Sequence, residues 1–137
     1  MTIRPYRASD EAAVIALWRE CGLVRWADPR KEIARKLRVN PEWFLVGELD
    51  GAVIATCMVG YEGHRGWVNL LAVAPLHQRG GKGRALMAEA ERILREAGCA
   101  KINLQVRATN RRVIAFYKKL GFAVENLVHL GKRLAPD

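Results

Sequence analysis

The 137-residue chain has little cysteine and no long apolar run. Its three cysteines, Cys21, Cys57 and Cys99, are odd in number, widely separated and set in apolar segments. We therefore expect reduced, packed thiols instead of a disulfide framework or a metal site. No apolar run approaches the roughly 20 residues of a membrane-spanning helix, and residues 1–5 lack the apolar core of a signal peptide. The prediction is a cytoplasmic protein with no membrane partner and no metal.

Acidic residues are scarce relative to basic ones: 14 Asp and Glu stand against 23 Lys and Arg, a formal net charge of +9. Such an excess attracts nucleic acid, an anionic membrane or a phosphorylated small molecule, and composition does not choose between them. Half of the residues are apolar, which excludes intrinsic disorder. A chain of this length buries about 68% of its unfolded surface, so we expect residues 1–137 to form a single domain.

The spacing of apolar residues predicts an α/β (α+β) fold with the order βααβββαβαββ. Helices are expected between Asp10 and Gly22 and at residues 30–37, 83–97 and 111–120. Strands are expected at residues 3–6, 43–49, 52–59, 67–73, 102–106, 122–124 and 127–130. Asp50-Gly51 supplies the positive φ angles of a tight hairpin turn between the second and third strands.

The fourth expected strand runs into a glycine-rich loop, and the loop runs into a long helix. Glycines at Gly80, Gly81 and Gly83 let backbone N–H groups approach an anion, and the first turn of the helix adds unpaired donors. The pattern predicts a phosphate cradle. It is not a P-loop, whose first glycine would fall at Leu76, nor a dinucleotide fingerprint, whose third would fall at Leu86.

Two motifs resemble those of the GCN5-related N-acetyltransferase (GNAT) family. The first is Gln-x-x-Gly-x-Gly at residues 78–83, preceded by a Leu-Ala-Val-x-Pro strand end. The second is residues 110–122, which is similar to the family's Asn-x-x-Ala-x-x-Phe-Tyr-x-x-x-Gly-Phe segment. Their order and their separation of about thirty residues strengthen the resemblance. It implies a small single-domain bacterial GNAT protein, with a mixed, mostly antiparallel central sheet flanked by helices.

The resemblance also implies an acetyl-CoA site. In the family, the strand matching residues 67–73 carries a bulge and splays from the strand matching residues 102–106, and pantetheine lies in the opening. Backbone groups of Leu71 and Val73 would bond pantetheine and polarise the acetyl carbonyl. Residues 79–84 would hold the pyrophosphate. The implied cofactor-binding residues are Leu71, Ala72, Val73, Gln78, Arg79, Gly80, Gly81, Lys82, Gly83, Arg84, Asn110 and Tyr117.

Catalysis is implied for Tyr117, which would return a proton to the departing thiolate, since a phenol remains protonated at neutral pH. The alternative for Tyr117 is a packed aromatic, and Asn110 is equally suited to cap a helix. Asn69 stands where many family members have a Glu that relays the amine's proton. Glu62 and His64 are candidate bases by residue type, although a solvated loop is the simpler interpretation of both.

The implied reaction is acetyl transfer to a primary amine, on a small molecule, a peptide N-terminus or a lysine, by direct attack on the thioester. The alternatives are a catalytically weak acetyl-CoA sensor and, less favoured, a nucleic-acid-binding domain using the basic helix from Arg30 to Arg38. Arg25 and Trp26 lie in the expected acceptor loop, where packing is the more common role of a Trp. The acceptor, the general base and the oligomeric state, including a homodimer, are left open.

Overall fold

The computed structural model describes all 137 residues, and its contacts divide the chain into two compact units. The first contains residues 1–104 and Asp137, and the second contains residues 105–136. The first unit holds β1 (Thr2–Pro5), α1 (Glu11–Glu20), α2 (Pro29–Lys36), β2 (Phe44–Leu49), β3 (Ala52–Tyr61), β4 (Gly66–Val73), α3 (Lys82–Glu96) and β5 (Ile102–Asn103). The second unit holds α4 (Arg111–Lys119). The single domain stays a prediction.

The sheet of the first unit has the order β1-β2-β3-β4-β5. Its first three pairs are antiparallel, and β4 pairs with β5 in parallel. The hairpin turn forms as predicted, with φ angles of 50° at Asp50 and 80° at Gly51. The mixed, mostly antiparallel sheet flanked by helices confirms the expected fold class.

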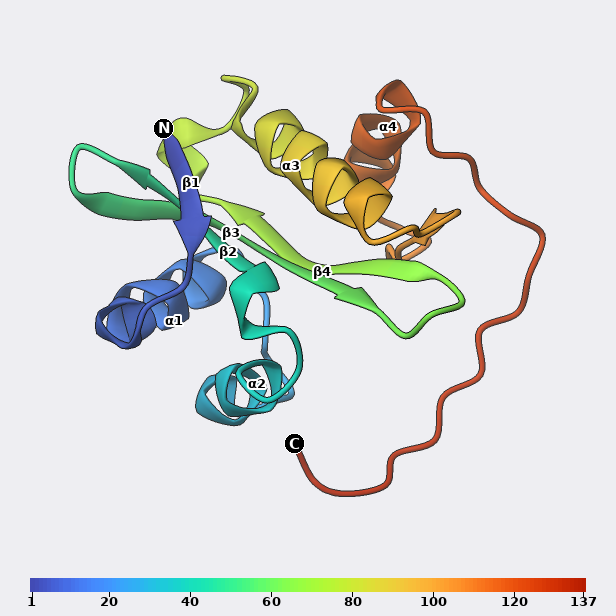
Figure 1. Cartoon of the computed structure of the whole chain (residues 1–137), viewed down its shortest axis with the longest axis horizontal. Coiled ribbons are helices and arrows are strands. Elements are labelled where there is room, and N and C mark those ends of the chain that lie inside the picture. The colour runs from blue at the N-terminus through green and yellow to red at the C-terminus, as the bar shows by residue number, and fades with distance from the viewer. The chain divides into compact units, whose positions relative to one another are not determined.

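The helices of the first unit lie on opposite faces of this sheet (Figure 1). On one face, Trp18 of α1 and Ile33 of α2 pack with Phe44 and other sheet residues in a buried apolar cluster. On the other face lies α3. A Cβ added to Gly66 of β4 would stand 2.8 Å from Leu94 of α3, so the close approach of helix and strand requires a glycine there.

Three of the predicted strands need correction. The fifth strand was expected at residues 102–106 but pairs only over Ile102–Asn103, and the strands expected at 122–124 and 127–130 do not form. Alternation of apolar residues shows which face a strand would bury, but a strand forms only where a neighbouring edge supplies its hydrogen bonds. The segment after α4 has no such ladder and runs as a long coil (Figure 1). Its Leu127 and Leu130 are exposed.

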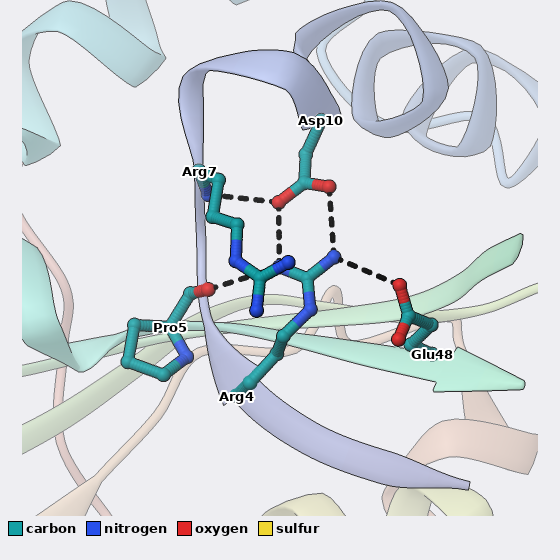
Figure 2. A network of polar contacts seen from close by, with 5 residues as sticks. All are labelled: Arg4, Pro5, Arg7, Asp10 and Glu48. Atoms are coloured by element: carbon teal, nitrogen blue, oxygen red, sulfur yellow. Dashed lines mark hydrogen bonds and ion pairs between the residues drawn. The ribbon is translucent and has the colours of Figure 1, made fainter. Parts of the chain in front are cut away.

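A network around Arg4 joins β1 to β2 and to the start of α1 (Figure 2). The Arg4 guanidinium donates two hydrogen bonds to the Asp10 carboxylate, at 2.8 and 2.9 Å, and one to Glu48 at 3.1 Å. The backbone N–H of Arg7 also donates to Asp10, at 2.8 Å. The hydrogen bond from Arg4 holds the pKa of the Asp10 carboxyl below its ordinary value.

This network predicts a pH-dependent loss of stability. Because the folded-state pKa of Asp10 lies below its ordinary 3.8, the ionised carboxylate stabilises the fold above that value and stops doing so as the pH falls through the folded-state pKa. We expect Asp10→Asn to lower the free energy of unfolding by about 2 kcal/mol at pH 7, since it removes the charge from the buried carboxylate and leaves the partly buried Arg4 with Glu48 as its charged partner. Urea denaturation should show the difference from wild type shrinking below pH 4. Asp50→Asn, in the exposed turn, is the control and should change little at either pH. A difference that stays constant with pH would contradict the ionic role of Asp10.

Candidate functional site

The start of α3 is open to an anion. Gly81 is the N-cap residue, with a φ of 80°, and no side chain caps the first turn. The first helical bond runs from Ala85 N–H to the Gly81 carbonyl, at 3.0 Å. No acidic residue lies in the first turn, whereas Lys82 and Arg84 lie within it and the exposed Arg79 precedes it. Backbone donors, the positive end of the helix dipole and three basic side chains therefore favour a phosphate at this point.

One edge of β4 is open next to this cradle. Strand β5 pairs only with Gly66 and Trp67, whereas β3 pairs with β4 as far as Val73. From residue 68 to residue 73, β4 therefore has a strand neighbour on one side only. Backbone N–H and C=O groups on the other side are unpaired by any strand, and a ligand that lies along the edge could bond them. The splay implied by the family resemblance stays a prediction, because β5 ends at Asn103.

The same stretch of β4 carries a bulge. Thr56 of β3 pairs with Ala72, but Met58 pairs with Asn69, so Leu70 and Leu71 together oppose the single residue between them on β3. Leu70 has a φ of 50°, in the left-handed region that residues other than glycine rarely adopt. The bulge expected for this strand is thus present at residues 70–71.

Two side chains anchor the end of β4. Gln78 donates from Nε2 to the Val73 carbonyl at 3.0 Å, and the Cys21 thiol, just after α1, donates to the same oxygen at 3.4 Å. Burial raises the pKa of the Cys21 thiol, which keeps it a donor. Gln78 was predicted to bind cofactor, and in this structure its amide holds the loop onto the strand. The sequence offered no signal for the contact of Cys21.

The second unit contains the other two predicted site residues. Asn110 begins α4, and its Oδ1 accepts a hydrogen bond from Val113 N–H at 3.3 Å, so it does cap the helix. Tyr117 is buried, and its ring lies edge-on to those of Phe116 and Phe122. The ring centroids are 5.0 Å and 5.5 Å away, respectively. These contacts support the packing role of Tyr117; its role as a general acid stays a prediction.

The candidate bases lie apart from the cradle. Glu62 and His64 are exposed on the loop between β3 and β4, and the hydrogen bond from Arg65 N–H lowers the pKa of Glu62. This loop is at the Gly66 end of β4, about 23 Å along the strand from Val73. Asn69, near the bulge, is exposed but cannot accept a proton at neutral pH. A solvated loop remains the better interpretation of Glu62 and His64.

Two surface features of the first unit bear on the alternatives. Trp26, in the loop between α1 and α2, is 77% exposed, so the packing role expected for it is wrong. On the basic helix, Arg30 pairs with Glu11, Arg35 pairs with Glu32 and Asp137, and Lys36 donates to a β3 carbonyl. Part of that helix's charge is therefore engaged by the protein itself.

The sequence model of the acetyltransferase (GNAT) family matches residues 11–122. The chain belongs to this family. An acetyltransferase of Yersinia enterocolitica is 44% identical over all of this chain and 98% of its own length. Among solved structures, Ard1 from Thermoplasma volcanium is 27% identical, with a TM-score of 0.78, over 90% of this chain and 83% of that one. The ribosomal-protein-S18-alanine N-acetyltransferase from Escherichia coli is 26% identical, with a TM-score of 0.73, over 88% of this chain and 76% of that one.

No helix is both long and apolar enough to cross a membrane. No three His, Cys, Asp or Glu side chains gather where they could hold a metal ion.

The conformation of the cradle predicts that its adjacent residues Gly80 and Gly81 tolerate substitution by alanine to different degrees. An alanine at Gly81 would meet no atom within 4 Å but must adopt a φ of 80°, which costs about 1–2 kcal/mol for a residue with a Cβ. At Gly80 φ is not in that range, and the added Cβ meets the flexible end of Lys82 at 2.9 Å and the His77 carbonyl oxygen at an ordinary 3.9 Å. We expect Gly81→Ala to lower the free energy of unfolding by that amount and Gly80→Ala to change it little, measured by urea denaturation. Equal effects would contradict this account of the turn.

Proposed function

We propose that this acetyltransferase-family protein uses acetyl-CoA to acetylate a primary amine on a small molecule, a peptide N-terminus or a lysine. The observation that carries the proposal is the continuity of the open β4 edge with the uncapped, basic start of α3. An extended pantetheine arm suits the edge, and its pyrophosphate suits the cradle. The residues present therefore fit acetyl-CoA.

The proposed cofactor contacts follow this geometry. Backbone groups of Leu71, Ala72 and Val73 would bond the arm and the acetyl carbonyl, and those of residues 79–84 would bond the pyrophosphate. Asn110 would add a contact to the arm while capping α4. An N–H aimed at the acetyl oxygen strengthens its interaction as negative charge develops there, which lowers the barrier to attack.

In the proposed reaction, the neutral amine forms a bond to the acetyl carbon and the carbon–sulfur bond breaks. The amine gives up a proton to solvent, and the thiolate receives one from Tyr117, which regains a proton from solvent. No covalent bond to the protein is needed. Exposed Trp26 and its neighbour Arg25 are candidate contacts for an aromatic or acidic acceptor. The name of the Escherichia coli relative makes peptide N-termini the first acceptors to test.

The proposed pyrophosphate contact can be tested by comparing the binding of acetyl-CoA with that of S-acetylpantetheine. We expect Arg79→Met combined with Lys82→Met to weaken acetyl-CoA binding about tenfold or more, because each variant removes a cation beside the phosphates. The affinity for S-acetylpantetheine, which lacks the pyrophosphate, should not change. Titration calorimetry measures both. Lys31→Met, at an exposed position of α2, is the control and should leave both affinities unchanged. Absence of acetyl-CoA binding by the wild type at millimolar concentration would refute the proposed cofactor.

The chemical step has its own test. We expect Tyr117→Phe to lower kcat about 100-fold or more while keeping the aromatic contacts with Phe116 and Phe122. Thiol release with a panel of peptide and small amines gives kcat, and thermal denaturation checks that the fold is kept. Near-wild-type kcat would remove Tyr117 from the acid role and leave it as a packing residue.

The second candidate function is a sensor that binds acetyl-CoA without transferring the acetyl group. It is favoured by Asn69, because this exposed amide stands near the bulge where a proton acceptor is expected in the family. Binding of acetyl-CoA with no thiol release on any amine would support the sensor over the enzyme.

A further inference from the structure

We propose that Trp18 and Thr56 are positioning residues that aim the Leu71 N–H at the acetyl group through a buried hydrogen-bond relay. The inference rests on the proposed function, since it assigns that N–H to the acetyl carbonyl. The relay itself lies wholly in the first unit, and runs from α1 through β3 to the bulge of β4.

The relay has two hydrogen bonds with a fixed direction. Trp18 Nε1 donates to Thr56 Oγ1 at 2.9 Å, and Thr56 Oγ1 contacts the Leu70 carbonyl at 3.0 Å. Indole can only donate and a carbonyl can only accept, so the threonine hydroxyl must donate to Leu70. Both side chains are fully buried, and each therefore depends on the relay for its partner.

The Leu70 carbonyl and the Leu71 N–H belong to one planar peptide group and point in opposite directions. Holding the carbonyl toward Thr56 therefore turns the Leu71 N–H away from Thr56. This peptide lies in the bulge, where the regular pairing with β3 is interrupted and the other edge of β4 is open. The relay thus sets the orientation of a donor that the ladder leaves undetermined.

The conformation of Leu70 shows why the bulge needs such a support. Its φ of 50° is costly for a residue with a side chain, and a relaxed peptide would swing the carbonyl away from Thr56. That movement would leave buried polar atoms of the relay unpaired. A second bond from α1's end, Cys21 to the Val73 carbonyl, holds the other end of the same segment. Residues 70–73 are thereby fixed at both ends from α1.

The test compares Thr56→Val, which keeps the side chain's shape but removes the hydroxyl, with Thr56→Ser, which keeps the hydroxyl. We expect Thr56→Val to lower kcat about tenfold or more, as loss of an aligned donor does, and Thr56→Ser to restore most of it. Binding gives the sharper readout. Thr56→Val should weaken acetyl-CoA binding but leave the affinity for CoA, which has no acetyl group, within about twofold.

Two controls separate positioning from general destabilisation. Val59→Ala removes buried volume from the same strand without touching the relay, and should leave kcat and the ratio of the two affinities unchanged. Trp18→Phe removes the first donor but keeps the Thr56 hydroxyl, and serves if Thr56→Val does not fold. It should shift the Leu71 amide resonance and reduce the preference for acetyl-CoA over CoA.

The outcomes distinguish this inference from the proposed function. Wild-type protein that binds no acetyl-CoA would refute the proposed function and this role with it, whereas the Leu71 amide shift in the variants would still report whether the relay orients the peptide. Normal acetyl-CoA binding by wild type, with unchanged kcat and unchanged affinity ratio in Thr56→Val, would overturn the positioning role alone.

Discussion

Strand β4 is paired on one side only over residues 68–73, and the rest of the site depends on this constraint. An unpaired edge leaves backbone donors and acceptors that must find other partners. The protein supplies a partner for one of these itself, because Gln78 and Cys21 both donate to the Val73 carbonyl. The Leu70 carbonyl is held toward β3 by Thr56, which leaves the Leu71 N–H directed away from β3.

Local features of this site could be predicted from the sequence because each depends on residues close together in the chain. The Asp50-Gly51 turn, the glycine loop and the start of α3 all follow from the φ angles that a few neighbouring residues allow. The bulge was expected only through the family resemblance. The relay could not be predicted, because Trp18 and Thr56 are 38 residues apart and nothing in either local pattern marks them as partners.

The wrong strand predictions have the same cause, because a local pattern does not show which distant segments will pair. Residues 122–124 and 127–130 have the alternation of strands, but a strand also needs an edge to pair with, and that edge depends on distant parts of the chain. The net charge of +9 likewise comes from groups of cations that composition does not distinguish. The cations at the start of α3 lie beside uncapped donors, whereas Arg30, Arg35 and Lys36 make contacts within the first unit that composition could not reveal.

The choice of leucine at position 70 is informative about the bulge. Glycine would adopt a φ of 50° at little cost, but it would also adopt many other conformations, and the Leu70 side chain would be lost from the apolar cluster against which it packs. Leucine costs about 1–2 kcal/mol in this conformation. Two buried hydrogen bonds of about 1 kcal/mol each are sufficient to offset that cost. The bulge is therefore held in one orientation by the balance between a strained residue and the buried relay from α1, and a fixed donor is what stabilising a developing charge requires.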